Sequence, residues 1–106
     1  MKLVLLKSKI SKEFPLEEGS NLIGRWDPDD GAFPEIDLDD VDDNARVSRK
    51  HAVVEVKGSV AVVEDLGSAN GTSVNTDEKL AVGQKVTLKD GDEILFGGVL
   101  LQFKTK

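Results

Sequence analysis

The sequence has no cysteine, one histidine and only three arginines among its 106 residues. Without cysteine there is neither a disulfide framework nor a thiolate for catalysis. A single histidine leaves no Cys/His set for a zinc site. A Ser-His relay is also disfavoured, because Ser48 and His51 are three residues apart, and such positions in a strand point to opposite faces unless the backbone bends. We therefore expect no enzyme, no metal and no cofactor.

Long hydrophobic runs are missing as well. The apolar run at residues 3–6 has four residues, too few for a signal peptide or a membrane span. The net charge is −6, whereas a nucleic-acid binder normally carries a basic face. We expect a cytoplasmic protein that binds neither membranes nor nucleic acid. Its length fits a single domain over residues 1–106, with a monomer as the default state.

The sequence does contain short runs in which apolar and polar residues alternate. They occur at residues 54–57, 60–63, 85–89, 93–96 and 99–103. The runs are rich in β-branched residues and bounded by turn residues, among them Asn70-Gly71 and Gly97-Gly98. A period of two without a long helical pattern predicts an all-β fold, a two-sheet β-sandwich whose loops gather at the strand ends.

Residues 26–46 depart from this pattern, and eight of the twelve aspartates fall within them. We expect a long surface loop with a brief strand at 35–38 and a single helical turn near 41–45. The calcium-loop pattern, with glycine at its sixth position, fits from neither Asp27 nor Asp40. A solvated acidic loop is the preferred interpretation. Weak divalent-cation binding, or repulsion of unphosphorylated acidic competitors, are the alternatives.

The scarce arginines all stand beside predicted strand ends. Arg25 follows Gly24 at the end of a predicted strand at 21–23, and Arg46 and Arg49 flank Ser48 at the start of the next clear strand. Guanidinium groups are well shaped for bidentate contacts with phosphate, and a serine hydroxyl adds a further donor. These positions therefore suggest an anion-binding site.

A turn containing Ser68, Asn70 and Gly71 adds backbone amides near the same strand ends. Each feature alone has a simpler explanation. Arg25 would pair with a loop aspartate, Ser48 would close a turn, and Asn70-Gly71 would form a hairpin. The joint pattern favours binding over these alternatives.

That joint pattern resembles the forkhead-associated (FHA) domain family. It comprises Gly24-Arg25, Ser48-Arg49-Lys50-His51, Asp65-Leu66-Gly67-Ser68-Ala69-Asn70-Gly71-Thr72 and Val74-Asn75. The resemblance implies a sandwich of about eleven strands with functional loops at one end. It also implies that the chain binds a threonine-phosphorylated protein through an extended segment. The alternative is an FHA-like scaffold used for phosphate-independent protein binding or oligomerisation.

The resemblance suggests roles for the individual binding residues. Arg25 would hold the phosphate, Ser48 would donate a hydrogen bond to a phosphate oxygen, and Arg49 would contact the phosphate or the peptide main chain. Asn70 would bond the peptide backbone just after the phosphothreonine. Arg46 is a candidate reader of an acidic side chain about three residues downstream.

The remaining positions of the motif carry structural expectations. Ser68 is a further candidate phosphopeptide contact. Gly24 and Gly71 are expected to provide backbone geometry, and His51 to brace the loop that carries Ser48. Many relatives have threonine where this chain has Ala69, so one hydroxyl donor is missing. We expect retuned or weaker binding from that change.

Overall fold

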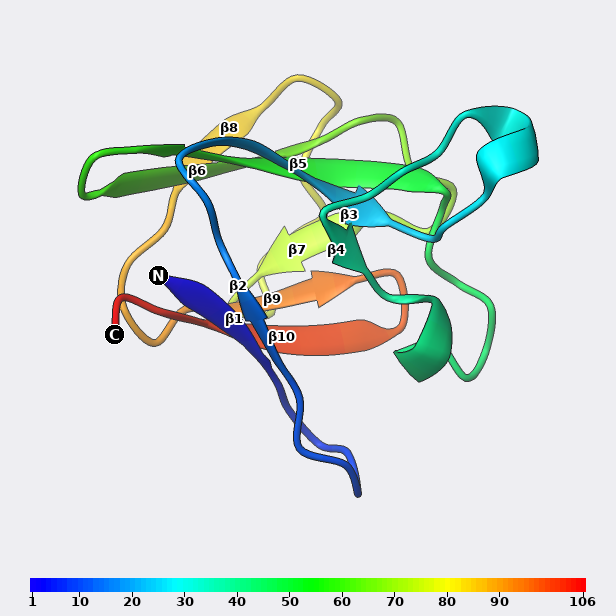
Figure 1. Ribbon diagram of the computed structural model, residues 1–106. Helices are drawn as coiled ribbons and strands as arrows, with labels where there is room; N and C mark the ends of the chain where they lie inside the picture. The colour runs from blue at the N-terminus through cyan, green and yellow to red at the C-terminus, as the bar shows by residue number, and fades with distance from the viewer.

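The computed structural model describes residues 1–106 and contains two five-stranded sheets packed face to face (Figure 1). The strands are β1 (Lys2–Leu5), β2 (Glu13–Pro15), β3 (Gly19–Gly24), β4 (Ile36–Asp37), β5 (Lys50–Lys57), β6 (Val60–Asp65), β7 (Thr72–Val74), β8 (Lys85–Thr87), β9 (Glu93–Phe96) and β10 (Val99–Lys104). Two 3-10 helices, η1 (Pro28–Asp30) and η2 (Asp39–Val41), lie in the acidic segment.

One sheet has the strand order β2-β1-β10-β9-β7 and the other β4-β3-β5-β6-β8. All neighbouring strands are antiparallel except the β3–β4 pair, which is parallel. The predicted all-β sandwich is confirmed, with ten strands where the resemblance implied about eleven. The structure has no helix with the length and apolar character that crossing a bilayer requires.

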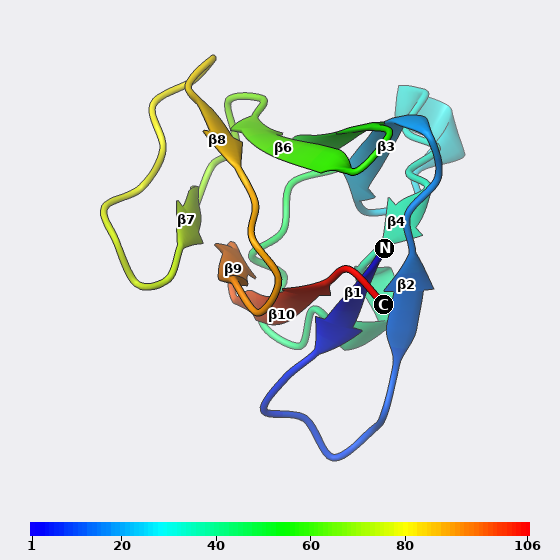
Figure 2. The same cartoon turned by 90° about the vertical axis from the view of Figure 1, so that its left-hand side faces the viewer.

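The core lies between the two layers, which Figure 2 shows one above the other. It consists of 19 buried apolar residues drawn from both sheets. Alternation explains the packing: Val99, Leu101 and Phe103 of β10 are each at most 4% exposed, while the residues between them reach the surface. Strands of period two thus bury one face against the opposite sheet.

The acidic segment is more structured than its composition indicated. The brief strand expected at 35–38 is present as β4. The helical turn expected at 41–45 is wrong in its position, because η2 ends at Val41. Ala45 has a φ of 52°, which is incompatible with a helix there. The first helix, η1, was not predicted; proline at its first position suits a helix start.

Five strand termini meet at one end of the sandwich. Gly24 at the end of β3 pairs with Lys50 at the start of β5. β6 ends beside the start of β5, and Thr72 at the start of β7 pairs with Phe96 at the end of β9. The loops that follow or precede these residues therefore gather on the right-hand side of Figure 1.

Candidate functional site

His51 lies beneath the loops at this end and is fully buried. The β3–β5 register shifts between Ile23 and Gly24, so β5 contains a bulge at His51. The bulge turns the imidazole inward, where Nδ1 accepts a hydrogen bond from the backbone N–H of Ser48 at 2.9 Å. Nε2 therefore carries the proton and donates to the carbonyl of Gly71, also at 2.9 Å. His51 thus ties the Ser48 loop to the turn after β6.

A catalytic relay would join the hydroxyl of Ser48 to the imidazole. In this structure His51 contacts the backbone N–H of Ser48, and the Ser48 hydroxyl instead accepts the N–H of Ala69. Burial lowers the pKa of His51 below its usual 6.5, and the Gly71 carbonyl and the charges of Asp65 and Asp42 offset this only in part. The ring is therefore neutral at pH 7.

Asp65 organises the turn that follows β6. Its Oδ1 accepts hydrogen bonds from the hydroxyls of Ser68 at 2.6 Å and Thr72 at 2.7 Å. Its Oδ2 accepts from the backbone N–H groups of Gly67 at 2.9 Å and Ser68 at 3.0 Å. Burial raises the pKa of Asp65, but these four hydrogen bonds outweigh burial, and the pKa lies below its ordinary value. The carboxylate is therefore charged and fixes the turn.

The hydroxyl of Ser68 belongs to this turn. It donates to Asp65 and accepts the N–H of Gly71 at 2.9 Å. Its hydrogen is therefore not free for a phosphate oxygen, and the geometry favours a structural role over the predicted contact. The turn is also no hairpin: β6 pairs with β8 and β7 with β9, so Asn70 and Gly71 cross from one sheet to the other.

Ser48 presents its hydroxyl at the surface of the loop before β5. Its Oγ accepts the backbone N–H of Ala69 at 3.0 Å. Because the bond uses an oxygen lone pair, the hydroxyl hydrogen remains available to donate to an anion. Ala69 takes part through its backbone, so the lack of a side-chain hydroxyl there does not disturb Ser48.

The Arg25 side chain is bound to the protein through Nε, and the rest of its guanidinium is partly exposed. Its Nε donates to the carbonyl of Val47 at 2.6 Å, and its side chain is 31% exposed. Asp39 and Asp42 approach the guanidinium, each at 3.9 Å. Asp42 is itself structural, because its side chain is 2% exposed and accepts the backbone N–H groups of Arg46 and Val47. The terminal nitrogens of Arg25 retain free N–H donors.

Arg49 is paired with the acidic loop. Its Nε lies 2.7 Å from Oδ2 of Asp27, and its NH1 lies 3.7 Å from Oδ2 of Asp30. An open depression is lined by Arg25, Asp30, Ser48, Arg49 and Lys50. The structure thus brings Arg25, Ser48 and Arg49 together, with Lys50 as a fourth donor that the sequence did not single out. No group of three His, Asp or Glu side chains is arranged to hold a metal ion.

Asn70 and Arg46 lie next to this depression. The side-chain amide of Asn70 donates to the carbonyl of Arg46 at 2.9 Å, which leaves its own Oδ1 free. Arg46 is exposed and is the one arginine without an ion pair. Its backbone packs on Gly97, where a Cβ would come within 2.3 Å of the Arg46 carbonyl oxygen. Only glycine fits at position 97. The sequence indicated a turn there but not this close contact with Arg46.

Gly24 and Gly71 lie where the backbone favours glycine. A Cβ on Gly24 would lie 1.8 Å from the carbonyl oxygen of Arg49, so β3 and the Ser48 loop approach closely only with glycine there. Gly71 has a φ of 88°, which favours glycine. Asn70 does not share this positive φ, so the pair is not the tight turn that Asn-Gly suggested.

Comparisons with known sequences agree with this geometry. Residues 21–97 match the sequence model of the FHA domain. The chain is 34% identical over 103 residues to protein FraH of Nostoc, covering 96% of this chain and 35% of FraH. It is 40% identical over 86 residues to the FHA domain-containing protein FhaA of Mycobacterium tuberculosis, covering 81% and 14%. The chain therefore spans about a third or less of these relatives.

Solved structures show the same architecture. One, from work on phosphothreonine-dependent FHA domain interactions, has a TM-score of 0.74 and 34% identity, covering 98% of this chain and 96% of that one. Another is Mycobacterium tuberculosis EmbR in complex with a low affinity phosphopeptide. Its TM-score is 0.75 at 31% identity, covering 99% of this chain and 24% of EmbR.

Proposed function

Because this chain belongs to the FHA domain family, we propose that its loop end binds phosphothreonine-containing segments of other proteins. The observation that carries the proposal is the shared depression, where Arg25, Ser48, Arg49 and Lys50 converge. These groups supply guanidinium, hydroxyl and ammonium donors to one small region. An anion with several acceptor oxygens and high charge density is the ligand that such a set fits best.

The phosphate would be held mainly by two residues. Arg25 uses Nε for the Val47 carbonyl, which leaves its terminal N–H groups for phosphate oxygens. Ser48 accepts from Ala69 and so donates its hydroxyl hydrogen outward. Charge-assisted hydrogen bonds contribute about 1.5–3 kcal/mol each. Three or four of them, less ordering costs, correspond to dissociation constants on the order of micromolar.

The peptide main chain and its downstream side chains would use the neighbouring turn. Asn70 has a free Oδ1 and a second amide hydrogen for the backbone that follows the phosphothreonine. Arg46, beside it and unpaired, is suited to an acidic side chain further along. Because the Ser68 hydroxyl is held by Asp65, Ser68 would act by shaping the turn and not by touching the phosphate.

Carboxylates of the acidic loop would compete for the same donors. Asp27 and Asp30 lie against Arg49. A phosphate at pH 7 carries roughly −1.5 to −2 charges and three strong acceptor oxygens. It therefore has more charge and more acceptors for the guanidinium groups than a single loop carboxylate.

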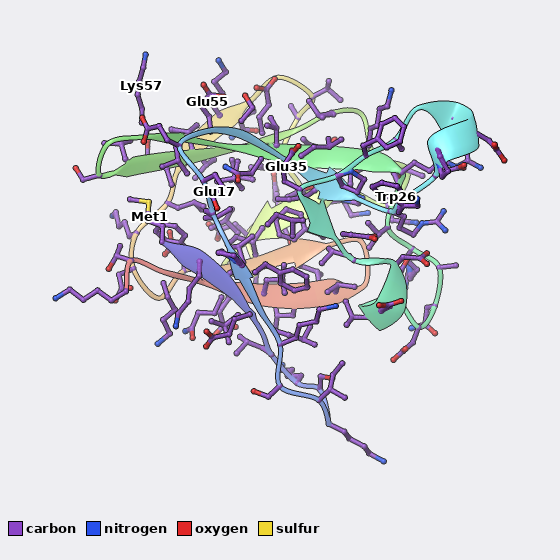
Figure 3. All side chains as sticks on the ribbon, in the orientation of Figure 1. Met1, Glu17, Trp26, Glu35, Glu55 and Lys57 are labelled. Carbon is purple, nitrogen blue, oxygen red and sulfur yellow. The ribbon has the colours of Figure 1, made fainter.

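The test is fluorescence anisotropy with a degenerate phosphothreonine peptide library and its unphosphorylated twin. Wild type is compared with Arg25→Ala and with Lys57→Ala, which removes one positive charge at the opposite end of the sandwich (Figure 3). We expect binding that requires the phosphate and is lost in Arg25→Ala but retained in Lys57→Ala. Equal binding of the two libraries would refute phosphate recognition and favour a phosphate-independent scaffold.

A further inference from the structure

An exposed aromatic pair stands on the loop between β3 and β4. Trp26 is 54% exposed and Phe33 is 53% exposed. Their rings meet edge to face, with centroids 5.2 Å apart at 80°. The other three aromatic side chains, Phe14, Phe96 and Phe103, are at most 6% exposed. Two of the five aromatic residues are thus displayed together on one surface loop, and large exposed aromatic surface often marks a contact site.

The loop holds this pair in place. The backbones of Asp27 and Ala32 exchange two hydrogen bonds, of 3.0 and 2.8 Å, which close the segment around η1. The backbone N–H of Trp26 donates to the side chain of Asp37 at 3.1 Å. Ala32 and Pro34 are buried on either side of Phe33. Because the backbone that carries Trp26 and Phe33 is already fixed, binding of a ligand to the pair would cost little further conformational entropy.

The pair borders the proposed phosphate site. Trp26 directly follows Arg25, and Asp27, the next residue, holds Arg49. In Figure 2 the η1 loop lies to one side and the turn after β6 to the other, with the chain leading into β5 between them. A peptide whose residues after the phosphothreonine run toward Asn70 would place its preceding residues over the η1 loop. This step rests on the proposed function.

The surroundings of the pair favour a cation. Asp29 and Asp30 are exposed on η1, within the same loop. Aromatic faces attract guanidinium and ammonium groups, and carboxylates beside them strengthen that attraction. A basic side chain could contact both at once, whereas an acidic side chain would be repelled. Of the two aspartates, only Asp30 is committed to Arg49, at 3.7 Å.

We propose that Trp26 and Phe33 form a subsite for an arginine or lysine side chain on the N-terminal side of the phosphothreonine. The chain would then select peptides with a basic residue before the phosphorylated threonine. An exposed cation–π contact corresponds to about a two- to fivefold gain in affinity. The subsite adds specificity without contacting the phosphate itself.

The experiment uses phosphothreonine peptides in which one of the four residues before the phosphothreonine is Arg, Leu, Glu or Ala, the rest being Ala. Wild type is compared with Trp26→Ala, Trp26→Phe and Phe33→Ala. Val60→Ala serves as a matched control, because Val60 is an exposed apolar residue in the β5–β6 hairpin at the other end. Circular dichroism confirms that each variant is folded.

Wild type should bind one Arg peptide about two- to fivefold more tightly than its Ala and Leu counterparts. Trp26→Ala and Phe33→Ala should lose this preference while still binding the all-Ala phosphopeptide as wild type does. Trp26→Phe and Val60→Ala should retain it. The subsite would be refuted if the Leu peptide bound as tightly as the Arg peptide or more tightly. It would also be refuted if Trp26→Ala still bound the Arg peptide more tightly than the others. Failure of the proposed function is distinguishable from failure of the subsite, because it would appear as equal binding of phosphorylated and unphosphorylated peptides.

Discussion

Replacing Asp65 by asparagine tests whether one buried carboxylate maintains the turn beneath the site. Asp65 is 3% exposed and accepts four hydrogen bonds, two at each oxygen. Asparagine offers one oxygen and one NH₂ group. The NH₂ would fit best in the place of Oδ1, because the hydroxyls of Ser68 and Thr72 can rotate to accept, whereas the backbone N–H groups at Oδ2 cannot.

The magnitude follows from the loss of charge. Hydrogen bonds to a charged group contribute about 1.5–3 kcal/mol and neutral ones about 0.5–1.5 kcal/mol. Four weakened bonds, partly offset by the easier burial of a neutral amide, give a loss on the order of 2 kcal/mol in the free energy of unfolding. For a domain of this size, each kcal/mol corresponds to roughly 4–8 °C in Tm. Asp65→Asn should therefore lower Tm by about 10 °C.

The assay is thermal and urea unfolding followed by circular dichroism, since the single tryptophan is exposed and is a poor reporter of the core. Asp77→Asn is the matched control, because Asp77 is exposed and its side chain makes no hydrogen bond or ion pair. Asp65→Asn and Asp77→Asn remove the same charge. If the two variants unfolded at the same temperature, the four hydrogen bonds of Asp65 would contribute no net stability, and the reasoning would be refuted.

Two further predictions concern pH and competition at the site. The pKa of the single histidine, His51, is lowered from 6.5 in the folded protein, so as pH falls the unfolded chain binds this proton at a higher pH than the folded protein does. The free energy of unfolding should therefore decrease as pH drops below about 6.5. Urea unfolding between pH 7.5 and 5.5 measures this, and a His51→Gln variant with the same pH profile would contradict it. Asp30→Asn should strengthen binding of an all-Ala phosphopeptide by up to about fivefold, because it removes one of the two carboxylates that pair with Arg49 and leaves Asp27 in place. Asp29→Asn, which removes the same charge without an ion pair, is the control, and equal affinities would contradict competition.

Much of the fold could be predicted because alternation is a local signal. Each run of period two had a buried face and became a strand, as in β10. Irregular features depend on contacts between distant segments and left no such signal. The bulge at His51 arises where β3 meets β5, and it lets the imidazole accept the backbone N–H of Ser48, a contact that the period of two does not predict. The helical turn near residue 45 failed because Ala45 adopts a positive φ in a loop fixed by Asp42.

The candidate site was partly visible for a different reason. Arg25, Ser48 and Asn70 were recognisable as a set because their residue types and order are distinctive. Their partners were not recognisable, because ion pairs and backbone contacts are made across the fold. The sequence showed eight aspartates in one acidic segment but not that Asp42 caps the loop before β5 or that Asp27 holds Arg49.

The arrangement separates the groups that would bind from the groups that hold them. His51 and Asp65 are buried and fully hydrogen-bonded, and no buried side-chain polar atom in the structure lacks a partner. Arg25 and Arg49, by contrast, are partly exposed and paired with carboxylates at the rim. Stability and the proposed binding should therefore depend on different residues, so Arg25→Ala should abolish binding without unfolding the chain.

The same pairing means that phosphate binding would exchange one anion for another. In the free protein the guanidinium charges of Arg25 and Arg49 are already neutralised by loop aspartates at 2.7–3.9 Å. The free energy of binding is then the difference between phosphate and carboxylate contacts, which is smaller than the gross hydrogen-bond energy. Because the loop aspartates lie within the screening length of roughly 8 Å at 0.15 M salt, they oppose the anion at close range. The acidic loop would thus limit the affinity for phosphate while leaving the geometry of the Arg25 and Arg49 donors intact.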